Sequence, residues 1–295
     1  MNQYAEPQKI SFKLYGGLEN KNYPIDLRST ADFLIQFQHI VDKSFCVITG
    51  KERVTLKNKE DYQLLVKDIG VGSVSADLLL VVKGVALALP MMGFTNPKTI
   101  WDYACLSIEF FSAYSNALSK KQNPIINMTS SGDSSPVILN LQIGDKITNY
   151  PSEILPIAQK SLYSYKKMAR AMINGNFNSF NAVSQDNNAF QMTYEDAMLY
   201  LQKNTIMDDA YSYTGNIIDF NKETMRGRVR ILEGDFKNRE FPFSVLGSQL
   251  PNPYIDAMNY LSVNFFAVAE INKNALETQV VRLHIMEISK MLDLT

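Results

Sequence analysis

The chain holds few side chains that could carry out acid–base, nucleophilic or metal chemistry. It has two histidines, His39 and His284, and two cysteines, Cys46 and Cys105. Zinc and iron sites bring several His or Cys ligands together at short sequence spacing, and this sequence has no such cluster. A Ser-His-Asp triad would need one of the histidines beside an activated serine, and no Gly-x-Ser-x-Gly turn presents such a serine. The sequence therefore predicts no catalytic residue, no metal site and no cofactor.

Two other patterns that look like sites have simpler structural explanations. Glu195-Asp196 and Asp208-Asp209 are adjacent acids, and adjacent side chains on a helix point in different directions. We expect Glu195-Asp196 to lie in the first turn of a helix, where the helix dipole favours acids. Gly70-Val71-Gly72-Ser73 lacks the Gly-Lys-Ser/Thr of a phosphate-binding loop and precedes a strand pattern, which predicts a hairpin turn.

Three arginines at alternate positions form the sharpest pattern in the chain. In a strand, Arg226, Arg228 and Arg230 share one face, and Val229 and Ile231 point to the opposite face. We call these three arginines the arginine stripe. The alternation predicts that the stripe faces outward and the two aliphatic residues face a core.

Three interpretations of the arginine stripe stay open: a solvated face that discourages edge pairing, the contact for an acidic protein partner, and a binding face for single-stranded nucleic acid. Bases could stack on Tyr211, Tyr213 or Phe220 of the preceding strand. Nucleic acid is less favoured, because 29 Lys and Arg against 30 Asp and Glu leave a net charge of −1. The candidate surface for a partner or nucleic acid comprises Arg226, Arg228, Arg230, Tyr211 and Tyr213.

The elements of residues 1–120 predict an N-terminal α/β domain with antiparallel strands and long helices. Strand patterns at 9–15, 62–69 and 73–82 show apolar alternation, and the last two suggest a β-hairpin. A helix capped by Ser29 or Thr30 follows the first strand. A second long helix opens at Asn96-Pro97 and runs to about residue 120.

The middle of the chain is expected to be a connection followed by helices. Residues 121–136 are polar and rich in turn formers, which indicates a linker or flexible loop. Residues 137–207 are predicted to be a mainly helical region, with helices from 151 to about 173 and from Thr193. The asparagine-rich residues 174–190 between those helices predict a loop.

Residues 208–295 predict a small C-terminal β-barrel domain. The order of elements is β-β-β-α-β-β, as in an OB-like barrel, and an SH3-like barrel stays open. The expected strands are 211–220, 225–232, 239–246, 263–271 and 276–288, with a helix at 254–262. The fold class is therefore α+β, with an N-terminal α/β unit and an OB/SH3-like barrel.

Bulk composition indicates an ordinary soluble protein. Of the 295 residues, 46% are apolar and 20% charged. The most apolar run, Ala76–Phe94, is broken by charged residues, glycine and proline, which excludes a membrane-spanning segment of roughly 20 apolar residues. Two cysteines form no disulfide framework, so we expect a reducing, cytoplasmic location.

The whole chain resembles phage anti-defence proteins that inhibit the bacterial Gabija system. The resemblance is carried by Ile10–Gly17, Asp26-Leu27-Arg28, Gly72–Val82, Gly215–Asp219 and Gly227-Arg228-Val229. It implies an inhibitor without enzymatic activity, which assembles as a homo-oligomer around a large host nuclease–ATPase complex and blocks its access to DNA. No contact residue of that family is assigned to a position of this chain.

These observations together predict a non-catalytic protein-interaction protein of the host cell cytoplasm. The absence of catalytic groups, the aromatic content of 11% and the resemblance support this prediction. The alternative is a nucleic-acid-binding module that uses the basic face of the C-terminal barrel.

Overall fold

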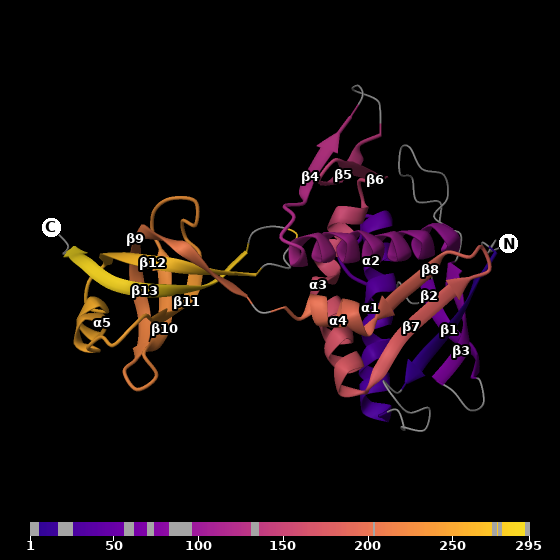
Figure 1. Cartoon of the computed structure of the whole chain (residues 1–295), viewed down its shortest axis with the longest axis horizontal. Helices are drawn as coiled ribbons and strands as arrows, with labels where there is room; N and C mark the ends of the chain where they lie inside the picture. The colour runs from indigo at the N-terminus through magenta and orange to yellow at the C-terminus, as the bar shows by residue number, and fades with distance from the viewer. Residues whose placement is uncertain are drawn as a thin grey trace. The chain divides into compact units, whose positions relative to one another are not determined.

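The computed structural model describes residues 6–16, 26–55, 62–69, 74–82, 96–130, 136–202, 204–272, 276 and 279–292. The chain forms two compact units, Met1–Gln202 and Lys203–Thr295, and each is described by itself (Figure 1). Both helices and strands are present, so the mixed fold class is confirmed. Within the described residues, no helix is both long and apolar enough to cross a membrane.

The first unit is built on a five-stranded antiparallel sheet with the order β2-β3-β1-β7-β8. Its strands are β1 (Gln8–Gly16), β2 (Tyr62–Ile69), β3 (Val74–Val82), β7 (Phe177–Ser184) and β8 (Ala189–Thr193). The β2–β3 pairing confirms the hairpin, whose turn at 70–73 lies outside the described residues. Alternation along β1 buries Ile10, Phe12 and Leu14 and leaves Ser11 and Lys13 exposed.

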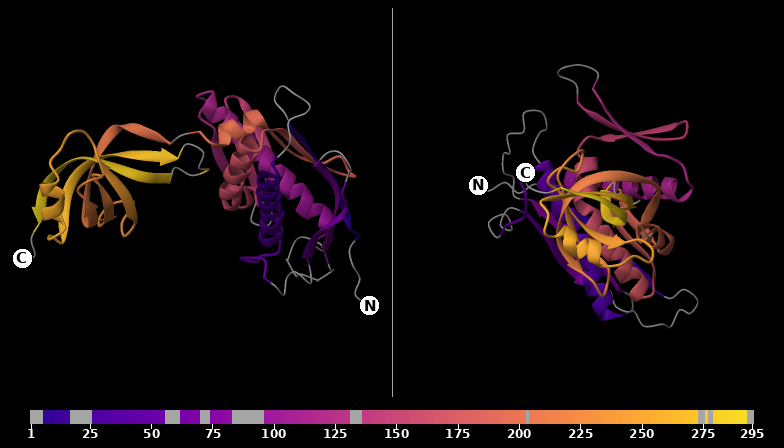
Figure 2. Two further views of the ribbon diagram at one scale, coloured as in Figure 1. Left: turned by 90° about the horizontal axis from the view of Figure 1, so that it is seen from below. Right: turned by 90° about the vertical axis from the view of Figure 1, so that its left-hand side faces the viewer.

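Helices cover one face of this sheet, as Figure 1 and Figure 2 show. They are α1 (Leu27–Ile48), α2 (Pro97–Ser119), α3 (Ile154–Asn174) and α4 (Tyr194–Tyr200). Aromatic side chains fill the space between the layers: the ring of Phe180 lies 4.9 Å from Phe33 and 5.1 Å from Phe37. Phe37 also contacts Trp101 of α2 at 6.1 Å, edge to face. The core therefore joins α1, α2 and β7.

Side-chain caps fix where the helices begin. Asp26 caps α1, because its carboxylate accepts the Ser29 N–H at 2.7 Å, so the prediction of a Ser29 or Thr30 cap was wrong. Asn96 caps α2 in the same way. Thr193 and Asp196 form a reciprocal capping box at α4, as expected for acids in a first helical turn.

The middle of the chain contains more strands than the sequence indicated. Strand β4 (Ile125–Thr129) lies inside the predicted linker 121–136 and pairs with β5 (Ile138–Ile143), which pairs with β6 (Lys146–Pro151). Strands β7 and β8 replace the predicted loop 174–190. Residues 137–207 thus hold β5, β6, β7 and β8 besides two helices. In β7, non-local pairing with β1 overrides the turn propensity of asparagine.

The second unit is a closed five-stranded barrel with the strand order β10-β11-β13-β12-β9, and β9 also pairs with β10. Its elements are β9 (Thr205–Asn221), β10 (Arg226–Ile231), β11 (Glu240–Val245), α5 (Asn252–Ala257), β12 (Ser262–Asn272) and β13 (Gln279–Leu292). Neighbouring strands are antiparallel except β11 and β13, which are parallel. The predicted barrel is confirmed, and its core includes Val229, Phe243 and Phe265.

Candidate functional site

The arginine stripe lies on the outer face of β10. All three side chains are exposed, whereas Val229 and Ile231 between and after them are fully buried. The structure therefore places the stripe where strand alternation predicts it, on a rigid element of the barrel.

Two of the three arginines are engaged with carboxylates of the neighbouring strands. Arg228 Nε lies 2.6 Å from Asp219 Oδ2 on β9, and Arg230 Nη2 lies 2.6 Å from Glu240 Oε1 on β11. The three positive and two negative side chains leave a local charge of +1. Exposed pairs of this kind add little stability, but they neutralise charge that phosphates would otherwise meet. Of the three arginines of the stripe, Arg226 is the one for which the described residues show no such pair.

The structure does not bring the candidate tyrosines to the arginine stripe. Strand β10 pairs with residues 215–221 of β9, whereas Tyr211 and Tyr213 lie opposite Ala267 and Phe265 of β12. Tyr213 stacks on Phe265 at 5.7 Å and packs against the core, and Tyr211 is half exposed.

Phe220, the remaining aromatic of this strand, lies beside the arginine stripe but is not free to stack on a base. It stacks on Phe243 and Tyr254 of the barrel core. The stripe therefore lacks the aromatic platform that single-strand binding uses.

A hydrogen-bonded network of serine, histidine and glutamate lies across three other strands of the barrel. Ser244 Oγ of β11 is 2.8 Å from His284 Nδ1 of β13, and His284 Nε2 is 3.2 Å from Glu270 Oε2 of β12. Asn204 donates to the same carboxylate at 2.9 Å, and Arg282 lies 3.7 Å from it. Burial would raise the pKa of Glu270, but these hydrogen bonds and positive charges outweigh burial and hold that pKa below its usual value.

The network resembles a catalytic triad in composition but not in its surroundings. Acyl transfer also needs N–H donors aimed at the developing oxyanion. The N–H of Val245 donates to the Met225 carbonyl at 3.0 Å, and the N–H of Leu246 donates to the Ile285 carbonyl at 2.8 Å. The two N–H groups after Ser244 are thus engaged in the barrel, and the network's visible role is to connect three strands.

Sequence reasoning missed this network because its members are far apart in the chain. Ser244 and His284 are 40 positions apart and become neighbours only through the parallel pairing of β11 and β13. His284 and Glu270 meet through the β12–β13 pairing, which contains three register shifts. An isolated histidine in a strand was the sole signal in the sequence.

A row of exposed apolar side chains continues from this network on the same outer face. Leu246 directly follows β11 and donates its N–H to Ile285 of β13, Met286 is the next residue of β13, and Phe266 of β12 is paired with Glu287. The exposed fractions of Leu246, Met286 and Phe266 are 41%, 43% and 41%. We call these three residues the apolar row. Phe266 lies between buried Phe265 and Ala267, and Met286 follows buried Ile285, so both project outward from strands of the barrel.

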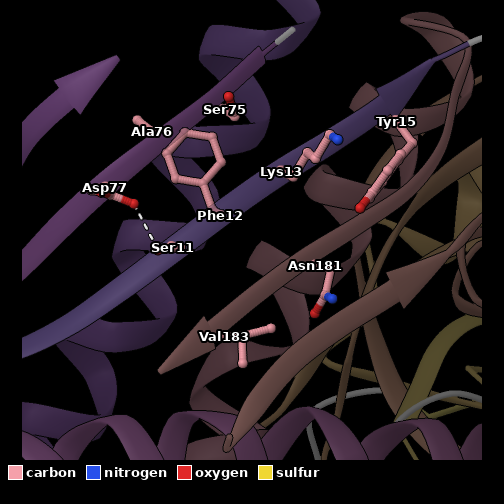
Figure 3. Close-up of a pocket in the computed structure, with 9 residues that line it drawn as sticks. All are labelled: Ser11, Phe12, Lys13, Tyr15, Ser75, Ala76, Asp77, Asn181 and Val183. Carbon is pink, nitrogen blue, oxygen red and sulfur yellow. Dashed lines mark hydrogen bonds between the residues drawn. The ribbon is translucent and has the colours of Figure 1, made fainter. Parts of the chain in front are cut away.

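The uncovered face of the first unit carries a hollow of about 390 Å³, shown in Figure 3. Its polar lining includes Ser11 and Lys13 of β1, Asp77 of β3 and Asn181 of β7. Ser11 donates to Asp77 at 2.6 Å, and Lys13 Nζ lies 4.9 Å from the ring centre of Tyr15. Ser11 and Asp77 satisfy each other, Asn181 Oδ1 has no hydrogen-bond partner among the described residues, and these groups form no nucleophile–base pair.

The remaining candidates for chemistry are dispersed. His39 is exposed on α1, and both cysteines are buried and free. Burial raises the pKa of the Cys105 thiol far above its ordinary value, which keeps it protonated. In the described part of the chain, no three His, Cys, Asp or Glu side chains are grouped as a metal ion requires. The prediction of no metal, cofactor or catalytic residue stays a prediction.

Comparisons with known proteins do not assign the chain to a family. No family model, no curated protein and no solved structure matches the chain.

Proposed function

We propose that the chain is a non-catalytic protein-interaction protein whose barrel presents the apolar row to a protein partner. The observation that carries the proposal is that Met286 of β13, Phe266 of β12 and Leu246, which follows β11, are all exposed on neighbouring segments of the barrel. Methionine and aromatic side chains are enriched in protein interfaces, and burying such a row removes apolar surface from water. The rigid strands keep the entropic cost of binding low.

The topology supports assigning the barrel to the OB type rather than the SH3-like type. Counted along the unit, the strands follow the order 1-2-3-5-4, strands 3 and 5 are parallel, and α5 lies between strands 3 and 4. OB barrels bind ligands on the face of strands 2 and 3, which here are β10 and β11. The apolar row begins at Leu246, just after β11, and its other two residues lie on β13 and β12.

Within this proposal the partner is a large host protein complex. The resemblance to Gabija inhibitors supports a bacterial nuclease–ATPase as the first partner to test, with the chain acting as a cytoplasmic homo-oligomer that blocks access to DNA. The apolar row supports the class of partner, and the resemblance supports its identity.

Co-purification with matched variants tests the proposal. Tagged full-length chain is expressed with the Gabija nuclease–ATPase complex, and captured partner is quantified. We expect Met286→Glu to reduce capture at least tenfold, because a charge would be buried at the interface. Met198→Glu replaces a methionine on α4 that is 53% exposed, against 43% for Met286, and should leave capture unchanged. If Met286→Glu captured as much partner as the native chain does, the apolar row would not be part of the interface. If the native chain were recovered without the nuclease–ATPase complex, that complex would be rejected as the partner.

The second candidate function is single-stranded nucleic-acid binding through the arginine stripe. The observation in its favour is that the stripe lies on strand 2 of the barrel, where OB folds bind oligonucleotides. If all three arginines contact phosphates, the logarithm of the affinity should fall with the logarithm of salt with a slope of about −2. Unchanged affinity after replacing all three arginines with alanine would reject this function.

A further inference from the structure

Strand β8 forms one edge of the five-stranded sheet and pairs on one side only, with β7, in the described part of the chain. Exposed edges usually carry lysine, proline or inward charges that discourage strand addition. The opposite edge, β2, carries Lys67 and Asp68, whereas β8 reads Ala-Phe-Gln-Met-Thr and has no charge and no proline. The β8 edge is therefore open to pairing with an extended segment.

The register of the β7–β8 hairpin shows which backbone groups point to this edge. The Ser184 N–H donates to the Asn188 carbonyl at 3.0 Å, so residues 184 and 188 form a hydrogen-bonded pair. Bonded and non-bonded pairs alternate along an antiparallel ladder. Phe190 and Met192 therefore bond to β7, and Ala189 and Gln191 direct one N–H and one carbonyl each outward.

The backbone of Thr193, the last residue of β8, agrees with this alternation. The N–H of Thr193 also points away from β7, and it donates to the Asp196 carboxylate at 2.9 Å. Two N–H and two carbonyl groups, at Ala189 and Gln191, are thus left for an added strand of about five residues.

Strand β8 lies beside α2 (Figure 1), and a groove lined by residues of both elements runs beside these groups. It has a volume of about 460 Å³ and is bounded by one stripe of α2 and by Ala189, Gln191 and Asp196. The α2 side is lined by Cys105, Ile108, Glu109, Ser112, Ala113 and Asn116. Buried Ile108 and Cys105 form an apolar floor, and small residues next to it leave room for side chains of an added strand.

The charge of the groove is of one sign. Among the described residues that line it, Glu109 and Asp196 are ionisable besides the protonated Cys105 thiol, and none is a lysine, arginine or histidine. A segment with lysine or arginine at alternate positions would bring its cations to these carboxylates while its backbone pairs with β8.

The groove is held in shape by contacts at the start of β8. Trp101 Nε1 donates to the Asn188 carbonyl at 3.1 Å, and Asn188 Nδ2 donates to Asp102 at 2.5 Å. Lys98 of α2 forms an ion pair with Asp186 of the turn at 2.9 Å. These bonds fix the strand against α2 before any ligand arrives, which lowers the entropic cost of binding.

We propose that the groove between α2 and β8 binds an extended, basic peptide segment of a protein partner by strand addition. The backbone of Ala189 and Gln191 supplies the pairing, and Glu109 and Asp196 supply the preference for lysine or arginine. This site lies in the first unit and is independent of the apolar row.

The test uses the full-length chain and a fluorescein-labelled Lys-Val-Lys-Val-Lys peptide, with binding followed by anisotropy. We expect saturable binding that weakens with salt, no binding of Glu-Val-Glu-Val-Glu, and at least a tenfold loss when alternate peptide nitrogens are methylated. Glu109→Lys should weaken binding of the lysine peptide by a similar factor. Equal affinity for the methylated peptide, or for the Glu109→Lys variant, would overturn the proposal.

A matched pair of substitutions tests the edge itself. Gln191→Pro removes an N–H that the sheet does not use, so binding should be lost, whereas Gln191→Ala keeps that N–H and should bind as the native chain does. If the proline variant does not fold, the methylated peptide still decides the question. Self-association that Gln191→Pro abolishes and the lysine peptide does not displace would identify a second copy as the occupant and reject the proposal.

Discussion

Gly227 on β10 gives the sharpest test of how the barrel is packed. A methyl group at this position would overlap the Asp219 carbonyl oxygen and lie 2.7 Å from the Phe243 ring. An ordinary contact needs about 3.4 Å, so the ring would have to move by about 0.7 Å and the β9 backbone would have to move as well. Overpacking of this kind costs up to about 3 kcal/mol. For a unit of about 90 residues, a cost at this upper limit lowers the melting temperature by about 12–24 °C.

The control for Gly227→Ala is Gly234→Ala in the same unit. Gly234 has φ +80° and open space around the added methyl, so only backbone strain of about 1 kcal/mol is expected. Trp101, the single tryptophan, belongs to the first unit, so its fluorescence reports that unit while far-UV circular dichroism reports both. A Gly227→Ala variant whose dichroism transition moves no more than that of Gly234→Ala would refute the packing argument. A shift of the Trp101 transition would refute the independence of the units.

Two further predictions concern the Glu270 network and the aromatic core. The lowered pKa of Glu270 means that its carboxylate stabilises the barrel above about pH 4.3 and that this contribution is lost as pH falls through the lowered pKa. The difference in unfolding free energy between the native chain and Glu270→Gln should therefore shrink in denaturant titrations at acidic pH, and a difference that grows would contradict this. Phe180→Ala, in the centre of the first core, should cost about 3–5 kcal/mol in the Trp101 transition. A loss below about 1 kcal/mol would show that the core there is loosely packed.

Strong local patterns made much of the fold predictable. The hairpin of β2 and β3 and the long helices α1 and α2 follow from uninterrupted periodicity and nearby turn or cap residues. The barrel strands were recognisable for the same reason. Residues 174–190 were predicted as a loop because the pattern of a single sequence does not show long-range pairing. Strand β7 forms there by pairing with β1, which lies about 170 positions earlier in the chain.

The candidate surface was predictable in part, for a related reason. Alternation placed the arginine stripe outward, but nothing in the sequence showed that Asp219 and Glu240 would lie beside it. Tyr211 and Tyr213 were expected near the stripe because they precede it by one strand. Strand β9 is 17 residues long and pairs first with β12 and then with β10, so its two ends have different neighbours.

The central position of β1 has a consequence for synthesis. Its partner β7 emerges from the ribosome roughly 10–30 s after it, at about 5–20 residues per second. Until then one side of β1 offers unpaired hydrogen-bonding groups to any other nascent chain. Stalled chains ending before residue 177 should therefore be degraded by protease faster than chains that include 193, and equal resistance would show that the half-sheet protects itself.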